Sequence, residues 1–274
     1  MIKEGGKQKF GDKERPSEQP KKRTGRKVAL VIFLIVLFLA LAWLVLAPFR
    51  HNWSNFFVTL SQNESDQKQK AIDLYKSKIL APMSSAPYVE LGKLAAAQEN
   101  YAAAENDFKW ALQFNNKDSQ IYFYLIDSLI NQGKISDVNQ YLDQVQILDP
   151  NNPEIIFVKA RIAIKNNQLS QAESLLAQIS DQSPKYKQYY ILILLSEGKF
   201  DIIKKGADQQ LNLLVDEIKN SQNPIYKKAR LGLEWIKLGE KSFGCNLVGD
   251  ALTKDKTIKD KLTTWQPLFK TCNL

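Results

Sequence analysis

The sequence predicts an all-α protein, an α-solenoid of helix-turn-helix repeats preceded by a single transmembrane helix. Three observations carry this prediction. Apolar residues recur with a period of 34 residues, they fall at helical spacing within each period, and a long charge-free apolar run precedes them. The chain has 274 residues, of which 44% are hydrophobic and 24% charged, a globular composition.

The net charge of +9 is concentrated at the N-terminus. Residues 1–27 hold ten Lys or Arg and four Asp or Glu, a net of +6, and the other 28 basic and 25 acidic residues give only +3. A uniformly basic fold would suggest nucleic-acid binding, so this distribution predicts no nucleic-acid partner. Residues 1–27 have few apolar side chains to bury, and we expect them to form a disordered cytoplasmic tail.

Residues 28–49, VALVIFLIVLFLALAWLVLAPF, carry no charge. At 1.5 Å per residue they would span ~33 Å as a helix, close to the ~30 Å hydrocarbon core of a bilayer. A cleaved signal peptide is the competing interpretation, but its apolar region usually runs about 7–15 residues. The best candidate cut, after Ala47, would also place Pro48 next to the cleavage site. The run is therefore interpreted as an uncleaved anchor in contact with membrane lipid.

The charges that flank this run predict its orientation. KKRTGRK, residues 21–27, precedes the run, whereas only Arg50 and His51 follow it before Lys68. Segments rich in Lys and Arg stay in the cytoplasm. We therefore expect a single-pass protein of a bacterial inner or cytoplasmic membrane, with a cytoplasmic N-terminus and extracytoplasmic repeats. Residues 50–84 are expected to form a juxtamembrane linker and a leading helix.

Three blocks in phase, residues 85–118, 119–152 and 153–186, make up the clearest part of the repeat array. Positions 34 apart carry similar side chains, for example Tyr88, Tyr122 and Ile156, then Ala104, Val138 and Ala172, then Phe108, Leu142 and Leu176. The two helices of each block are expected to break near Glu99-Asn100, Gly133-Lys134 and Asn166-Asn167. A degenerate pair over 187–224 and a further block over 225–258 extend the array, and residues 259–274 are expected to form a capping helix and tail.

These blocks resemble the tetratricopeptide repeat (TPR) family, whose pattern is W-x2-L-G-x2-Y, then A-x3-F, then P. The matching segments are Tyr88-x2-Leu91-Gly92-x2-Ala95 with Ala104-x3-Phe108, Tyr122-x2-Leu125 with Pro150, and Leu231-Gly232-x2-Trp235. Lys159 stands where the third block should have leucine. The resemblance implies a protein-binding scaffold in which the first helices of successive repeats line a concave groove.

A candidate groove follows from this resemblance, on the face one residue away from the packing positions. Its residues are Val89, Lys93, Phe123, Asp127, Phe157, Arg161 and Ile164. Apolar residues at two levels with charges between them predict an apolar or amphipathic partner segment, anchored by Phe123 and Phe157. In the alternative, both phenylalanines pack against neighbouring helices and line no groove.

The two cysteines, Cys245 and Cys272, are expected to form a disulfide. Outside the cytoplasm such bonds persist, and this one would hold the closing helix against the last block. Two unpaired cysteines are the alternative interpretation.

No catalytic site, metal site or cofactor is expected. The single histidine, His51, lies at the predicted membrane boundary, and two cysteines cannot build a four-cysteine zinc site. The sequence also lacks the P-loop, dinucleotide-binding, zinc-protease and nucleophile-elbow motifs. A small-molecule ligand is not expected either.

The sequence therefore predicts a membrane-anchored protein–protein interaction scaffold. One alternative is a structural subunit of a cell-envelope assembly that serves secretion, pilus formation, division or wall synthesis. A more remote alternative is an accessory domain of an envelope enzyme.

Overall fold

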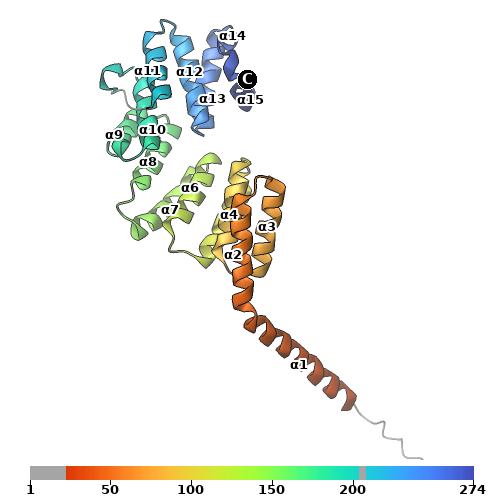
Figure 1. Cartoon of the computed structure of the whole chain (residues 1–274). Helices are drawn as coiled ribbons and strands as arrows, with labels where there is room; N and C mark the ends of the chain where they lie inside the picture. The colour runs from red at the N-terminus through yellow and green to blue at the C-terminus, as the bar shows by residue number, and fades with distance from the viewer. Residues whose placement is uncertain (1–22, 204–207) are drawn as a thin grey trace, which may run out of the picture. The chain divides into compact units, whose positions relative to one another are not determined.

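The computed structural model describes residues 23–203 and 208–274, and all regular elements within these ranges are helical (Figure 1). Residues 1–22, most of the segment expected to be disordered, lie outside the described ranges. The chain divides into two compact units, up to Trp53 and from Ser54 to Leu274.

The first unit contains α1 (Arg23–Val45) and the start of α2 (Ala47–Asn63). Side chains from Val28 to Leu41 are exposed in α1. Within the described part of the chain, no helix meets the length and hydropathy needed to cross a membrane. The transmembrane helix over 28–49 stays a prediction.

The second unit is an array of helix pairs. The leading segment is expected over residues 50–84, and its part in this unit, 54–84, contains the rest of α2 and the whole of α3 (Gln67–Leu80). The pairs that follow are α4 (Ser85–Ala97) with α5 (Tyr101–Phe114), α6 (Ser119–Asn131) with α7 (Ile135–Leu148), α8 (Pro153–Lys165) with α9 (Leu169–Ala177), and α12 (Pro224–Lys237) with α13 (Lys241–Lys254). This all-α, TPR-like array confirms the helical-repeat part of the predicted fold class.

The degenerate region between these pairs departs from the regular pattern. After η1 (Ser180–Gln182), α10 (Pro184–Ser196) begins before residue 187, so the expected block boundary falls inside this helix. Its partner α11 (Gln209–Asn220) follows only after η2 (Phe200–Ile202). The apolar phase is lost here because the second helix starts much later in the pair than in its neighbours.

Each turn between the two helices of a regular pair contains a residue with positive φ. These residues are Glu99, Gly133, Asn167 and Gly239, with φ of 57°, 75°, 58° and 86°. A left-handed residue ends a helix by redirecting the chain, and glycine adopts this conformation without steric cost. The first three turns lie at or next to the expected breaks.

The start of several first helices is set by a capping side chain followed by proline. The Asn152 side chain accepts a hydrogen bond from the backbone N–H of Glu154 at 2.9 Å, and Pro153 begins α8. Asn223 and Pro224 start α12 in the same way. The cap satisfies an otherwise unpaired N–H, and proline at the first helical position loses no hydrogen bond.

Glycine allows the two helices of the last pair to cross closely. A Cβ atom on Gly232 of α12 would lie 2.7 Å from the carbonyl oxygen of Gly244 on α13, and a Cβ on Gly244 would lie 2.5 Å from the oxygen of Gly232. Neither distance can accommodate a side chain, so both glycines are required by backbone approach.

The C-terminal segment consists of three short elements in place of one capping helix. These are α14 (Ile258–Lys261), η3 (Thr263–Trp265) and α15 (Gln266–Thr271). Pro267, in the first turn of α15, cannot donate the hydrogen bond that would continue an earlier helix. Cys245 and Cys272 form a disulfide, with Cα atoms 5.5 Å apart, which ties this segment to α13.

Candidate functional site

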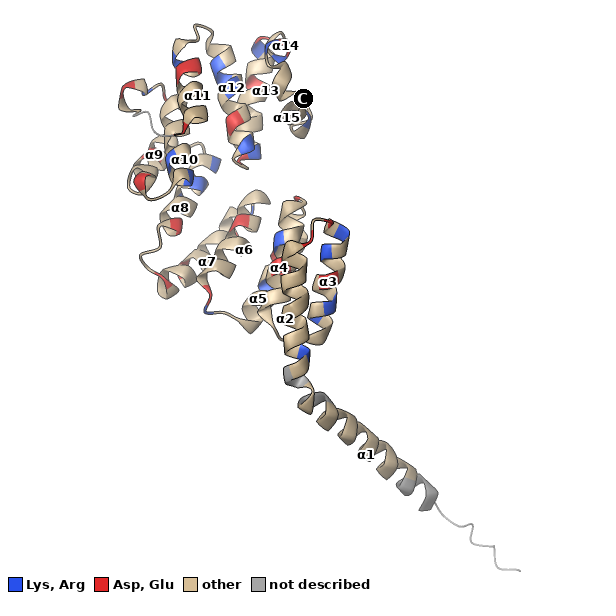
Figure 2. Ribbon diagram, in the orientation of Figure 1, with Lys and Arg blue, Asp and Glu red and all other residues tan. Residues whose placement is uncertain are grey.

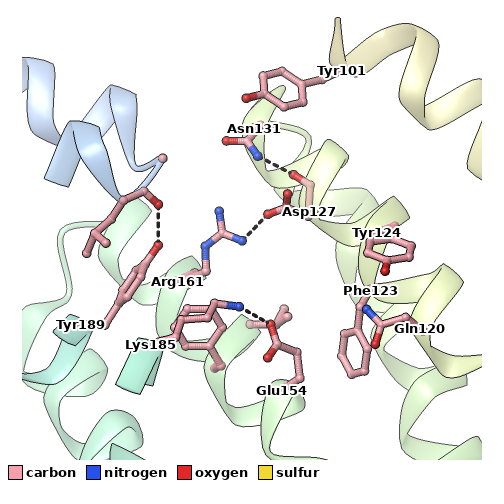
Figure 3. Close-up of a pocket in the computed structure, with 14 residues that line it drawn as sticks. Tyr101, Gln120, Phe123, Tyr124, Asp127, Asn131, Glu154, Arg161, Lys185 and Tyr189 are labelled. Carbon is pink, nitrogen blue, oxygen red and sulfur yellow. Dashed lines mark hydrogen bonds and ion pairs between the residues drawn. The ribbon is translucent and has the colours of Figure 1, made fainter. Parts of the chain in front are cut away.

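A cavity of about 380 Å³ opens on the face formed by the first helices of successive pairs (Figure 3). Three helices, α6, α8 and α10, supply most of its wall, and Tyr101 of α5 and the turn between α12 and α13 complete it. The lining residues are Tyr101, Gln120, Phe123, Tyr124, Asp127, Asn131, Glu154, Phe157, Val158, Arg161, Lys185, Tyr189, Leu238 and Gly239.

The repeat period explains why two of these helices present the same positions. Phe123 and Asp127 on α6 are each 34 residues before Phe157 and Arg161 on α8. Stacked repeats place equivalent positions on one continuous surface. The cavity is therefore a property of the array rather than of one helix pair.

A buried ion-pair network forms one wall of the cavity. Arg161 Nε donates a hydrogen bond to Glu240 Oε1 at 2.5 Å, and Arg161 Nη1 donates to the Asp127 carboxylate. Lys165 Nζ lies 3.5 Å from the other Glu240 oxygen. Burial disfavours the charged guanidinium, but Glu240 and Asp127 outweigh burial and raise the pKa of Arg161 well above its usual range. Arg161 is thus a permanent cation whose charge is neutralised inside the protein.

Tyr189 connects this network to the turn between α12 and α13. Its hydroxyl donates to the backbone oxygen of Leu238 at 2.9 Å and lies 3.3 Å from Glu240 Oε1. Burial raises the pKa of Tyr189, Arg161 opposes this shift, and Glu240 adds to it. The phenol therefore stays protonated and acts as a hydrogen-bond donor.

A second ion pair lies toward the exposed side of the cavity. Lys185 Nζ is 2.8 Å from Glu154 Oε1 and 4.1 Å from the centre of the Phe157 ring. The four charged lining residues, two acidic and two basic, are thus paired within the protein. A charged ligand would have to break one of these pairs, whereas a neutral polar or apolar segment would not.

The structure places the seven sequence-predicted groove residues in different environments. Phe123, Asp127, Phe157 and Arg161 line the cavity; Val89, Lys93 and Ile164 do not. Ile164 is completely buried in the core and is not available to a ligand. Lys93 pairs with Glu90 at 2.9 Å and lies 5.0 Å from the Tyr124 ring centre, beside the cavity. Val89 packs against the core.

The two phenylalanines that are predicted to hold a partner segment are largely enclosed. Phe157 is 0% exposed and packs against Tyr186 and Tyr189, with ring centres 5.0 and 4.8 Å away, and Phe123 is 6% exposed. Both residues line the cavity, and a partner would first contact more accessible rim residues such as Gln120.

Sequence reasoning did not identify several rim residues. Gln120 and Glu154 lie one turn before the predicted positions, and the repeat period could have identified them. Tyr101, Leu238 and Gly239 come from other pairs, and no local sequence pattern indicates that they reach this surface.

Helical-repeat proteins consist of stacked helix pairs, and this chain has that architecture. More particularly, the sequence model of the tetratricopeptide repeat family matches residues 137–193, so this part of the chain is similar to tetratricopeptide repeats. Proteins of this family bind peptide or protein partners on a scaffold that is typically non-catalytic. No curated protein matches the chain.

The chain is similar to several solved structures, among them PilF and YrrB. Pseudomonas aeruginosa PilF aligns at 14% identity and a TM-score of 0.49, over 80% of this chain and 97% of PilF. YrrB, a TPR protein with an unusual peptide-binding site, aligns at 16% identity and a TM-score of 0.41, over 63% of this chain and 86% of YrrB.

Proposed function

We propose that the protein is a membrane-anchored interaction scaffold whose cavity binds an apolar or amphipathic segment of a partner protein. The observation that carries this proposal is the cavity itself, because its lining residues repeat from α6 to α8 and its charges are already paired. An uncharged segment can enter without leaving a buried charge unpaired.

The proposal of a membrane anchor is based on the sequence. Residues 28–49 carry no charge, and the basic cluster at 21–27 favours a cytoplasmic N-terminus with extracytoplasmic repeats. The Cys245–Cys272 disulfide supports this placement, because such bonds persist outside the reducing cytoplasm. Protease added to intact spheroplasts should digest residues beyond Arg50 and spare the tail. Protection of the repeats would contradict the orientation.

Site-specific photo-crosslinking tests the cavity. A photoreactive amino acid replaces Gln120, an exposed cavity residue, and in a matched control it replaces Ile147, which is 74% exposed on α7. We expect a defined protein adduct from position 120 and none from position 147. Equal adducts from both positions, or none from position 120, would contradict the proposal.

A second measurement separates binding from folding. Tyr101→Ala and Gln120→Ala alter the rim without removing a fully buried side chain. We expect each variant to weaken binding of the crosslinked partner at least about tenfold, which corresponds to ~1.4 kcal/mol, with an unchanged Tm. A stoichiometric complex that survives detergent purification, and whose affinity neither substitution changes, would favour the structural-subunit alternative.

A further inference from the structure

Helix α3 exposes apolar side chains that a helix of a soluble array would normally bury. Ile72, Tyr75 and Ile79 are 48%, 56% and 78% exposed, and Met83 in the following loop is 75% exposed. At 100° per residue the three helical positions lie within about 60° of one another. The opposite face holds Leu74, which is completely buried in the core. These side chains form an exposed apolar stripe along one side of α3.

Lysines accompany the apolar stripe. Helix α3 contains four lysines and one aspartate, as the blue segments in Figure 2 show. Lys68 and Lys76 are exposed on the side of the stripe. The aspartate, Asp73, is buried and paired with Lys76 at 2.9 Å, so α3 keeps a net positive charge from its other three lysines. On the other flank, Lys78 Nζ lies 4.5 Å from the Tyr88 ring centre, and the Asp107 carboxyl is also near Lys78.

One exposed aromatic ring, that of Trp110, lies near Lys78 and packs on the buried ring of Tyr88. The Tyr88 ring, under Lys78, stacks with Trp110 at 6.2 Å between centres, and Trp110 is 48% exposed. Tryptophan and tyrosine are enriched where protein meets the lipid headgroup region, because one part of the ring system is apolar and another can hydrogen-bond.

The covalent chain limits the distance between this surface and the proposed anchor, whatever the orientation of the two units. Ser54 Oγ donates to the Ser77 backbone oxygen at 3.1 Å and lies 2.8 Å from Ser77 Oγ, which fixes the C-terminal end of α3 beside Ser54. Ser54 is five residues after Phe49, the last residue of the apolar run. Five residues span at most ~18 Å, so a bilayer that holds residues 28–49 lies within reach of this end of α3.

We propose that this surface, which we call the α3 patch (Lys68, Ile72, Tyr75, Lys76, Lys78, Ile79 and Met83), docks on an anionic lipid bilayer; the proposal rests on the membrane anchor proposed above. Apolar side chains enter the headgroup boundary while the lysine ammonium groups contact lipid phosphates. A symmetric contact with a second copy is disfavoured, because it would bring the same lysines face to face. Docking would hold the repeats against the membrane in one orientation.

A fluorescent label reports docking in the full chain. The two native cysteines are bonded to each other, so Ile79→Cys supplies a single thiol for an environment-sensitive dye. Ile147→Cys is the matched control, since the exposed fractions of the two isoleucines are 78% and 74%. The labelled protein is reconstituted into phosphatidylcholine vesicles with or without phosphatidylglycerol, and with a quencher on the lipid chains. We expect quenching and a blue shift at position 79 in anionic vesicles, and neither at position 147.

Variants that remove single lysines test the electrostatic contribution to docking. Lys68→Gln and Lys78→Gln should each lower the docked-to-undocked ratio about fivefold in anionic vesicles, the effect of losing one lysine at such a surface. Lys159→Gln, on the exposed surface of α8, should leave the ratio unchanged.

Vesicle flotation distinguishes the failure of docking from the failure of the anchor. If the protein floats with vesicles but the label at position 79 stays in water, the docking proposal is wrong and the anchor stands. If the protein does not float, both are wrong. A label at position 79 that is shielded without lipid quenching, together with a disulfide-linked dimer of the unlabelled Ile79→Cys protein, would assign the patch to a second copy and overturn the proposal.

Discussion

Arg161 and Glu240 form a buried ion pair between residues 79 positions apart in the sequence, with the Arg161 Nε atom 2.5 Å from Glu240 Oε1. Arg161 lies on α8, and Glu240 lies in the turn that joins α12 to α13. The pair therefore ties the last regular helix pair to the middle of the array. An exposed contact between Lys241 and Glu99, at 3.0 Å, extends this link to the first pair.

Removal of the arginine should destabilise the array strongly. Arg161→Met leaves the carboxylate of Glu240, which is 0% exposed, without its main partner. Breaking a buried pair in this way costs about 3–5 kcal/mol of unfolding free energy. Urea unfolding measures this loss. Asp127→Asn is the control, because its half-exposed carboxylate should contribute less than ~1 kcal/mol.

The double variant Arg161→Met/Glu240→Gln separates the unpaired charge from lost packing. With the carboxylate neutralised, we expect part of the lost stability to return, because the largest penalty comes from the uncompensated buried charge. A double variant less stable than Arg161→Met alone would contradict this account.

The repeated part of the fold could be predicted from the sequence because helix spacing and the 34-residue period are local properties. The turns at Glu99, Gly133 and Asn167 follow from the same period. The period does not specify how strongly the array curves. Contacts such as those of Glu240 with Arg161 arise only after several pairs have stacked, so no local pattern indicates them.

The part of the candidate site that depends on helical spacing could also be predicted from the sequence. Phe123, Asp127, Phe157 and Arg161 were identified because a helical face is set by residue spacing. Spacing alone does not show whether a face stays open, and Ile164 is covered by core residues such as Leu176 and Leu192.

Glu105 should make stability depend on pH in the acid range. Burial opposes ionisation of this carboxylate, but hydrogen bonds from Lys109 at 2.6 Å, Lys134 at 2.7 Å and Gln132 at 2.9 Å outweigh burial and lower its pKa from 4.5 to about 2. A lowered folded-state pKa gives stability that is present above the unfolded-state pKa and lost as pH falls toward the folded-state pKa.

The comparison with Glu105→Gln isolates this contribution. Above pH ~5 the variant should be less stable than the parent chain, and the difference should shrink as pH falls from about 4.5 toward 2. Denaturant unfolding at a series of pH values measures it. A difference that is independent of pH across this window would show that the carboxylate charge contributes nothing.

Reduction of the Cys245–Cys272 disulfide should lower stability. The bond closes a loop with a sequence separation of 27, and the chain-entropy relation gives about 3–4 kcal/mol for a loop of that size. Thermal unfolding with and without a thiol reductant measures the change. The double variant Cys245→Ser/Cys272→Ser should have the Tm of the reduced protein, and the reductant should not change it. Equal Tm values for oxidised and reduced protein would contradict the expectation.

The close crossing of α12 and α13 gives a prediction in which two Gly→Ala substitutions have opposite signs. In Gly232→Ala the new Cβ would lie 2.7 Å from the backbone oxygen of Gly244, which cannot move aside as a side chain could. Overpacking of this kind costs about 1–3 kcal/mol. In Gly249→Ala, on α13, the new Cβ has no neighbour within 4 Å, and the higher helix propensity of alanine should add up to ~1 kcal/mol. Urea unfolding should therefore place Gly232→Ala below the parent chain and Gly249→Ala above it. If both substitutions stabilise the protein, the two helices do not approach as closely as this crossing requires, and their separation is set by side chains instead.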